Sequence, residues 1–222
     1  MCPPSSSNSR SSPLNPTFFV PASEIGQKAF ELASSHLHPA ILNHSIRVYL
    51  YAKAVAASKR STYNTDQAKQ DLLFAACILH DIGTTERHNG PNRFEVDGAD
   101  AAVEHLAKFG MSEDDSKEVW VAIALHTSDG IVQRMGELAR IVRMAIEIDF
   151  GRNQVDEFEG LAGMKERFEG KYKRMEIEEV LGDEVVEQAV KSPGKAPPNS
   201  WPGVLYRSHL ENPNWPGVNK AF

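Results

Sequence analysis

The sequence predicts an all-α protein. Apolar residues recur at intervals of three and four along several long segments, which are flanked by residues typical of helix starts and ends, and no segment alternates apolar and polar residues as a half-buried strand does. A chain of 222 residues can form one domain with a substantial core. We therefore expect one helical domain over residues 23–190, with a flexible arm over 1–22 and a tail over 191–222.

The first predicted helices follow from their starts and their apolar stripes. Ser23 is a typical N-cap with Glu24 in the first turn behind it. A second helix follows Pro39, and its buried stripe consists of Ile41, His44, Val48, Tyr51, Ala52 and Val55. Residues 71–82 are apolar on almost every side, which predicts a central buried helix, and Gly83 is placed to end it.

The second half of the domain is also predicted to be helical. Residues 84–93 are too polar and too interrupted for regular structure and form a loop. Helices are expected over 97–109, ended by Gly110; over 112–127, with Ser112 and Asp115 as a capping pair; and over 136–150. Residues 154–189 are charged and helical in composition.

The two ends of the chain differ in composition from the domain. Residues 1–16 are rich in Ser, Pro and Asn and lack the apolar centre of a secretory signal, and no later segment is long enough to span a bilayer, so we expect a cytoplasmic protein without a membrane partner. The tail is rich in Pro and Gly but contains Trp201, Tyr206 and Trp215. We expect it to pack on the domain, with its two Trp-Pro-Gly-Val segments as turns; a lid over the site is the less favoured alternative.

Charge and cysteine content limit the classes of partner. The net charge is −6, and Lys and Arg are scattered among acidic residues, so the chain lacks the basic stripe that nucleic acid requires. The two cysteines, Cys2 in the arm and Cys77 in an apolar segment, indicate no disulfide framework and fit a reducing compartment. The sequence leaves open whether the chain forms a homo-oligomer.

Four polar residues occupy positions where the helices should bury apolar side chains. His44 lies on the apolar stripe of its helix, His80 and Asp81 end the central apolar segment, and Asp149 continues a stripe four residues after Ala145. Each alone has an ordinary explanation, such as a hydrogen bond to a carbonyl or an ion pair. Together they form a mixed nitrogen and oxygen ligand set suited to zinc, iron or manganese.

The pattern of a His, a His-Asp pair and a distant Asp resembles the HD-domain superfamily, and the segment from Ile78 to Gly83 is similar to its recognisable centre. Within that superfamily the chain is most similar to fungal cyanamide hydratases. The supporting segments are His80-Asp81-Ile82-Gly83-Thr84-Thr85, Arg93-Phe94-Glu95-Val96-Asp97-Gly98-Ala99 and Leu125-His126-Thr127-Ser128, within a region of similarity from about 39 to 151.

The resemblance implies an HD-type helical bundle that holds one divalent metal ion, with zinc expected first and iron or manganese as alternatives. Members with two metals usually place a further His where this chain has Glu95, which argues for a single ion. Such an ion lowers the pKa of a bound water toward neutrality, so that hydroxide can add to the nitrile carbon of cyanamide and give urea. In this interpretation His126 transfers protons, and Thr84 and Glu95 hydrogen-bond the amino end of the small neutral substrate.

Two rival functions stay open at this point. A phosphohydrolase acting on a nucleotide or another phosphate ester should carry cations around the metal, and only Arg87 and Arg93 are candidates in the loop near the His-Asp pair. Arg47 and Arg143 are expected in ion pairs away from substrate. A non-catalytic binding or signalling module is the rival from another class, and the presence of all four expected ligands argues against it. His88 and Asn89 have no assigned role.

Overall fold

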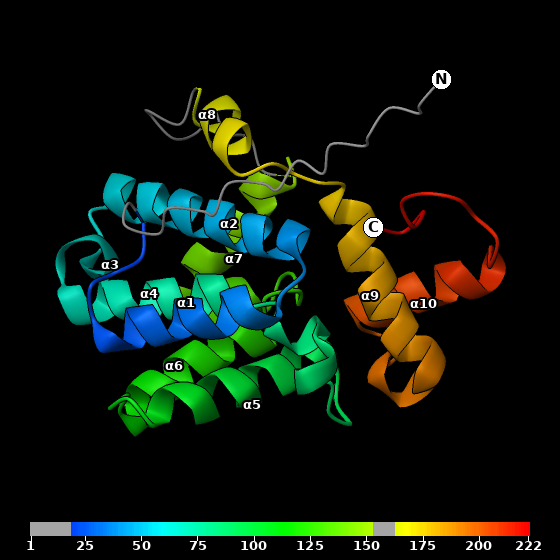
Figure 1. Ribbon diagram of the computed structural model, residues 1–222, viewed down its shortest axis with the longest axis horizontal. Helices are drawn as coiled ribbons and strands as arrows, with labels where there is room; N and C mark the ends of the chain where they lie inside the picture. Colours follow the sequence, from blue (N-terminus) through cyan, green and yellow to red (C-terminus); the bar gives the residue numbers. More distant parts are fainter. Residues whose placement is uncertain (1–18, 153–162) are drawn as a thin grey trace, which may run out of the picture.

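The computed structural model describes residues 19–152 and 163–222, and these residues form α-helices and short 3₁₀ turns without a strand (Figure 1). This confirms the all-α prediction. The predicted arm lies mostly on residues 1–18, and the charged region begins on residues 153–162; both stretches are outside the described part. The helices are α1 (Glu24–His36), α2 (Pro39–Ser58), α3 (Thr62–Thr65), α4 (Gln67–Leu79), α5 (Phe94–Ala107), α6 (Glu113–Ala124), α7 (Glu137–Asp149), α8 (Met164–Lys171), α9 (Ile177–Lys191) and α10 (Trp201–Glu211).

Helix α4 lies at the centre of the bundle, in contact with α1, α2 and α6 (Figure 1). Every side chain from Leu73 to Leu79 is fully buried, because this helix is apolar all round and neighbours cover it on all sides. The helix begins at Gln67, four residues before the predicted start, where the Asp66 side chain accepts a hydrogen bond from the backbone N–H of Lys69. The second helix, α2, packs on both α4 and α7.

Two predicted helix starts are confirmed by their caps. The Ser23 hydroxyl accepts from the backbone N–H of Gly26 at 3.1 Å, and the Ser112 hydroxyl accepts from that of Asp115 at 3.2 Å. Helix α5 starts at Phe94 rather than at residue 97. Its N-cap, Arg93, makes no side-chain cap hydrogen bond, so the usual cap signal is missing from the sequence there.

Gly83 does not end the central helix, contrary to the prediction. Helix α4 stops at Leu79, and the chain continues into the 3₁₀ turn η2 (Ile82–Thr84), in which Gly83 is not left-handed. A Cβ atom on Gly83 would lie 1.9 Å from the carbonyl oxygen of Phe94 and 2.7 Å from the backbone nitrogen of Gly98. Glycine is required because η2 presses against the start of α5. The expected irregular loop also contains a further 3₁₀ turn, η3 (Glu86–His88).

The described ends of the chain pack on the domain. Phe19, which the sequence placed in the flexible arm, is buried against the rings of Phe30 and Tyr172 at centroid distances of 5.4 and 5.7 Å. The tail forms α10, which packs on α9 and buries Leu205 completely (Figure 1). The tail therefore packs on the body, as predicted, but its first Trp-Pro-Gly-Val segment, expected as a turn, begins the helix α10.

A buried ion pair links the tail to the first turn of α5. Lys195, in the 3₁₀ turn η6 (Pro193–Lys195), donates to Asp97 Oδ2 at 2.7 Å and to the carbonyl of Gly90 at 2.6 Å. Both side chains of the pair are almost fully buried. Lys195 thus holds the tail on the start of α5 and on the loop that follows the His-Asp segment.

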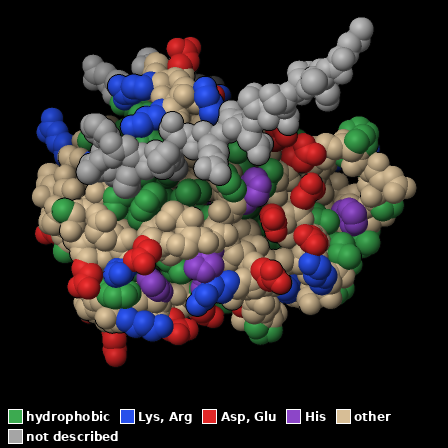
Figure 2. Space-filling view, in the orientation of Figure 1, with side chains coloured by type: hydrophobic (Ala, Val, Ile, Leu, Met, Phe, Trp, Pro, Cys, Tyr) green, Lys and Arg blue, Asp and Glu red, His purple; other side chains and the backbone are tan. Residues whose placement is uncertain are grey.

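The molecular surface mixes charges of both signs. On the face drawn in Figure 2, Lys and Arg side chains are interspersed with Asp and Glu, in line with the net charge of −6. Within residues 19–152 and 163–222, no helix is long and apolar enough to cross a membrane.

Candidate metal centre

Three of the predicted ligands meet between α2 and the end of α4. His44 lies on α2, His80 is the C-cap of α4, and Asp81 follows it at the start of η2. Each offers one ligand atom, and these atoms all lie within 4.8 Å of one another. All three side chains are at most 1% exposed. The contact between α2 and α4 therefore brings together residues that lie 36 positions apart.

Both imidazoles present an Nε2 lone pair to the same point. His80 Nδ1 lies 2.7 Å from the carbonyl of Cys77, which can only accept, so Nδ1 carries the proton. His44 Nδ1 lies 2.7 Å from Asp149 Oδ2 and donates to that carboxylate. In the neutral form of both rings, the unprotonated Nε2 atoms then face each other at 3.2 Å. Two facing lone pairs repel unless a cation lies between them or beside them.

The Asp81 carboxylate indicates the same need for a cation. Both of its oxygens are buried and accept no hydrogen bond from the described residues. Oδ2 lies 3.1 Å from His80 Nε2 and 3.8 Å from His44 Nε2. A buried carboxylate without donors is strongly unfavourable, and a divalent ion bound by Asp81 and the two imidazoles would remove that cost. The residues present therefore fit a metal ion of the zinc, iron or manganese class.

The ionisation of the cluster follows from burial and its close charges. Burial lowers the pKa of His44 despite the Asp149 carboxylate at Nδ1, so this ring is neutral at neutral pH. Burial opposes ionisation of Asp81, but the adjacent His80 and His126 hold its pKa well below the usual range. Burial also disfavours a charged His80, yet the Asp81 carboxylate outweighs it and raises the pKa of His80. The cluster thus attracts positive charge.

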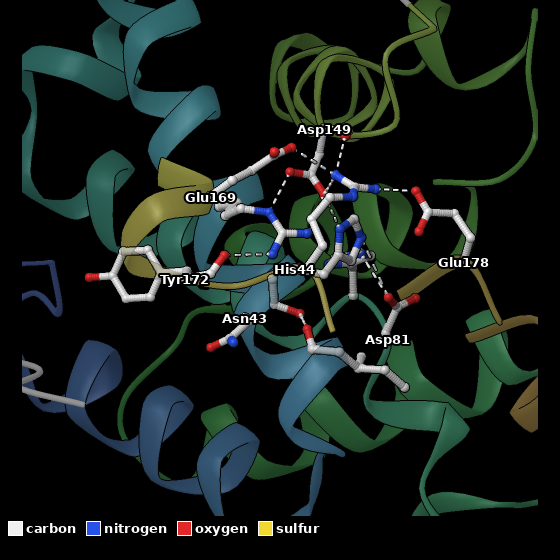
Figure 3. A network of polar contacts seen from close by, with 12 residues as sticks. Asn43, His44, Asp81, Asp149, Glu169, Tyr172 and Glu178 are labelled. Atoms are coloured by element: carbon white, nitrogen blue, oxygen red, sulfur yellow. Dashed lines mark hydrogen bonds and ion pairs between the residues drawn. The ribbon is translucent and has the colours of Figure 1, made fainter. Parts of the chain in front are cut away.

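Asp149 is not part of the three-residue cluster. It ends α7 and lies on one side of His44, whereas Asp81 lies on the opposite side (Figure 3). Its Oδ2 accepts from His44 Nδ1, and both of its oxygens accept from Arg47, at 2.7 Å for Nε to Oδ1 and 2.8 Å for Nη2 to Oδ2. The expectation that Asp149 is a metal ligand stays a prediction that this geometry does not support, because its oxygens are engaged on the far side of the ring.

Arg47 was expected in an ion pair away from substrate. It does form an ion pair, and its side chain is fully buried. Besides Asp149, its guanidinium donates through Nη1 to the carbonyls of Tyr172 and Lys173, at 3.0 and 3.2 Å. Charge pairing holds the pKa of Asp149 below its usual range against the effect of burial, since both His44 and Arg47 contact the carboxylate. The sequence signal was present: Arg47 lies three residues after His44, on a helix whose neighbour carries an inward acid.

His126 approaches the cluster from the turn that follows α6. Its Nδ1 lies 2.6 Å from the carbonyl of Ile123 and therefore donates to it, which leaves Nε2 as the reactive nitrogen. Nε2 lies 3.5 Å from Asp81 Oδ1, whereas the contacts of His44 and His80 with this carboxylate are to Oδ2. His126 thus lies next to the His-Asp pair, and its role in proton transfer stays a prediction.

Thr84 and Glu95 do not face the cluster. The Thr84 hydroxyl donates to the carbonyl of Asp81 at 2.7 Å, and the residue lines a separate polar cavity, which Asn89 also lines. Glu95 is fully buried and accepts from Arg93 at 2.6 Å and from the Thr127 hydroxyl at 2.5 Å. Their predicted contacts with substrate stay predictions without geometric support, because a helical hydrogen bond and an ion pair occupy the two side chains.

A cavity of about 260 Å³ opens onto the cluster. Its cationic residues are Arg143 and Arg152, not Arg87 and Arg93, which the sequence had offered. Arg143 is itself bound to the Glu147 carboxylate at 2.9 Å and to the His126 carbonyl at 3.1 Å. The cavity lining consists of His44, His80, Asp81, His126, Thr127, Asp129, Arg143, Ile146, Phe150, Arg152, Leu181, Trp201 and Phe222.

Comparisons with known proteins agree with this arrangement. The cyanamide hydratases DDI2 and DDI3 of Saccharomyces cerevisiae are each 30% identical to the chain over 127 residues, which is 54% of this chain and 55% of each relative. The chain thus matches about half the length of these curated relatives. The family model described as HD domain matches residues 41–181, which include His44, His80, Asp81 and Asp149. Since this match spans more than half of the chain, the protein belongs to the HD domain family.

Proposed function

We propose that this protein is a metal-dependent hydratase that converts cyanamide and water into urea. In this reaction the water oxygen bonds to the nitrile carbon, and both water protons end on the former nitrile nitrogen. The observation that carries the proposal is the buried Asp81 carboxylate, which faces two imidazole lone pairs and accepts no hydrogen bond from the described residues. The names of the two yeast relatives, cyanamide hydratases, supply the substrate.

In this proposal His44, His80 and Asp81 bind one divalent ion, with zinc as the first choice. Such an ion supplies Lewis acidity, which makes water a stronger acid and polarises a bound nitrile. Asp149 acts as a positioning residue: it accepts the Nδ1 proton of His44 and so keeps the Nε2 lone pair directed at the ion. Arg47 in turn fixes the Asp149 carboxylate through two hydrogen bonds.

His126 is the residue proposed to transfer protons. Because Nδ1 is occupied by the Ile123 carbonyl, only Nε2 can accept a proton from water and deliver it to the nitrile nitrogen. We assign to Thr127 the role that the sequence analysis gave to Thr84 and Glu95, namely a hydrogen bond to the amino end of the substrate. The Thr127 hydroxyl donates to Glu95 and its oxygen accepts from Arg93 Nη2 at 3.3 Å, which leaves one lone pair to accept from the amino group of cyanamide in the cavity.

The test measures metal content and urea release on the same preparations. Purified protein should carry about one divalent ion per chain and release urea from cyanamide, whereas His80→Ala and Asp81→Asn should lose both properties. His209→Gln is the matched control, because His209 lies on α10 and does not line the cavity. Urea formation by Asp81→Asn at the wild-type rate would refute the proposal. A metal-free, inactive wild-type protein would favour a non-catalytic module.

Hydrolysis of a phosphate ester is the second candidate, and the presence of Arg143 and Arg152 in the cavity lining favours it. Arg143 is already paired with Glu147, and Asp129 lies 3.7 Å from its Nη2, so its charge is largely compensated. Assaying the same preparations with nucleoside monophosphates and 4-nitrophenyl phosphate separates the two functions. Phosphate release without urea formation would replace the hydratase proposal.

A further inference from the structure

The cavity at the metal centre extends along an aromatic wall. The ring of Phe150 lies 4.7 Å from that of His44, the ring of Phe222 lies 5.3 Å from Phe150, and the ring of Trp201 lies 5.5 Å from Phe222. Ile146 and Leu181 add aliphatic side chains to the same cavity. One side of the cavity is therefore apolar, with the Arg152 guanidinium over the rings of Phe150 and Phe222 at 5.8 and 5.7 Å, and we call Ile146, Phe150, Leu181, Trp201 and Phe222 the apolar chamber.

The size of this cavity exceeds what cyanamide needs. Cyanamide has only three non-hydrogen atoms, whereas an engineered apolar cavity of about 150 Å³ already holds benzene. The cavity here is about 260 Å³. With cyanamide at the metal ligands, most of the apolar chamber would contain water against aromatic and aliphatic surface, which is unfavourable. The chamber thus has room for a ring or a short alkyl chain attached to the reacting group.

The segment that supplies Trp201 is fixed to the body. Gly203 approaches the carbonyl oxygen of Pro197 so closely that a Cβ atom would lie 2.0 Å from it, and Leu205 is fully buried. Trp201 also contacts the ring of Phe94, at 6.1 Å. The second Trp-Pro-Gly-Val segment differs, since Trp215 is 53% exposed and does not line the cavity. The first copy of the motif thus forms part of a preformed wall, and the second does not.

We propose that the preferred substrate is a substituted cyanamide or nitrile whose apolar or aromatic substituent occupies the apolar chamber, so that Trp201 and its neighbours determine specificity. This inference rests on the proposed function. The reaction stays balanced: one water adds to R–NH–C≡N or R–C≡N, its oxygen bonds to the carbon, and both protons end on the terminal nitrogen. The products are a substituted urea or a primary amide.

The test compares substituents in a binding assay and in an activity assay. Urea, methylurea, propylurea and phenylurea are titrated into zinc-loaded protein and followed by calorimetry, and the corresponding cyanamides are assayed for hydration. Each methylene that enters the chamber should strengthen binding about fourfold, since its burial is worth about 0.8 kcal/mol. Phenylurea should bind at least about tenfold more tightly than urea, and kcat/KM should rise in the same order.

Two tryptophan variants test whether Trp201 is responsible for the tighter binding of larger substituents. Trp201→Ala should weaken phenylurea binding by about tenfold and change urea binding much less, because it removes the wall that only the substituent touches. Trp215→Ala is the matched control, with the same local sequence, and should bind every urea as the wild type does. Equal affinity of the wild type for all four ureas, or equal losses in the two variants, would overturn the inference.

Failure of the inference and failure of the proposed function give different results. Hydration of cyanamide without any gain from larger substituents leaves the proposed function standing and removes the apolar chamber as a specificity site. Graded binding of the ureas without hydration of any cyanamide removes the proposed reaction and keeps the chamber as a ligand site. The titration of the wild-type protein with the four ureas tests the inference even if Trp201→Ala does not fold.

Discussion

The replacement of Arg47 by methionine tests the buried network beside the metal centre. Arg47 is fully buried, donates two hydrogen bonds to Asp149 and two to backbone carbonyls, and fills space that an unbranched apolar side chain can partly refill. Removal of one partner of a buried ion pair costs about 3–5 kcal/mol, because it leaves the other charge without compensation. In Arg47→Met, Asp149 would keep only His44 at hydrogen-bond distance, with Arg174 Nη1 at 3.7 Å.

We therefore expect Arg47→Met to lower the free energy of unfolding by about 3–5 kcal/mol, a large share of the stability of a typical domain. Urea denaturation of metal-free protein, followed by circular dichroism, measures this loss. The double variant Arg47→Met/Asp149→Leu should recover part of it, because no charge is then left buried. A loss below about 1 kcal/mol in the single variant, or a double variant no more stable than the single one, would contradict this account.

The same pair predicts the effect of acid. The folded pKa of Asp149 lies below its unfolded value near 3.8, so the carboxylate stabilises the fold above that pH, and this contribution is lost as the pH falls below about 4. Arg47→Met removes a cause of the shift, so the variant should lose less stability than the wild type over that acid range. A pH series of denaturation curves from 5 to 3 measures the difference, and parallel curves would contradict the assignment.

Three further predictions concern the surroundings of the site. Gly83→Ala should lower the free energy of unfolding by about 3 kcal/mol or more and reduce metal content, because its Cβ would collide with the backbone of α5. Gly194→Ala is the control: a Cβ there has no neighbour within 4 Å, so urea denaturation should show little change. Lys195→Met breaks a buried pair and should cost about 3–5 kcal/mol, while Lys191→Met breaks an exposed pair and should leave the unfolding curve unchanged. Zinc affinity, measured by competition with a chelator, should fall as the pH falls, because protons compete for the two imidazoles of the cluster. Burial opposes protonation of both rings, but the Asp81 carboxylate raises the pKa of His80, so this ring is protonated first. A pH-independent affinity would argue against histidine ligands.

The sequence predicted the elements that depend on local pattern. An apolar run such as 71–82 can only be buried, and a polar residue on a buried stripe, such as His44, requires a partner, so both could be identified without coordinates. The meeting of His44, His80 and Asp81 was inferred from three such misfits together with the family resemblance. The boundaries shifted, as at α5, where the usual cap residue is absent, and Gly83 serves close packing rather than the helix end that was predicted.

The side chains around the metal ligands were harder to predict, because their orientation depends on contacts between distant segments. Asp149 has the same burial whether it binds a metal or Arg47, so helical periodicity does not separate the two roles. Thr84 follows Asp81 by three residues, yet its hydroxyl donates a hydrogen bond to the Asp81 carbonyl within the turn and does not face the cluster. The two identical Trp-Pro-Gly-Val segments differ in structure: the first begins α10 and its Trp201 lines the cavity, whereas the second lies after that helix and its Trp215 is exposed.

The segment between α8 and α9 contacts the candidate metal centre indirectly, because the carbonyls of Tyr172 and Lys173 accept hydrogen bonds from Arg47. The side chains of Tyr172 and Lys173 give no sign of that role, since their backbone carbonyls accept these hydrogen bonds. A substitution that displaces this backbone would remove two hydrogen bonds from the Arg47 guanidinium. Arg47 would then hold the Asp149 carboxylate less firmly, and Asp149 would no longer fix the orientation of the His44 ring. If the proposed metal ion is bound there, it would then dissociate even though His44, His80 and Asp81 are all intact. Screens of variants for metal content would therefore detect faults in helix connections as well as faults in the ligands themselves.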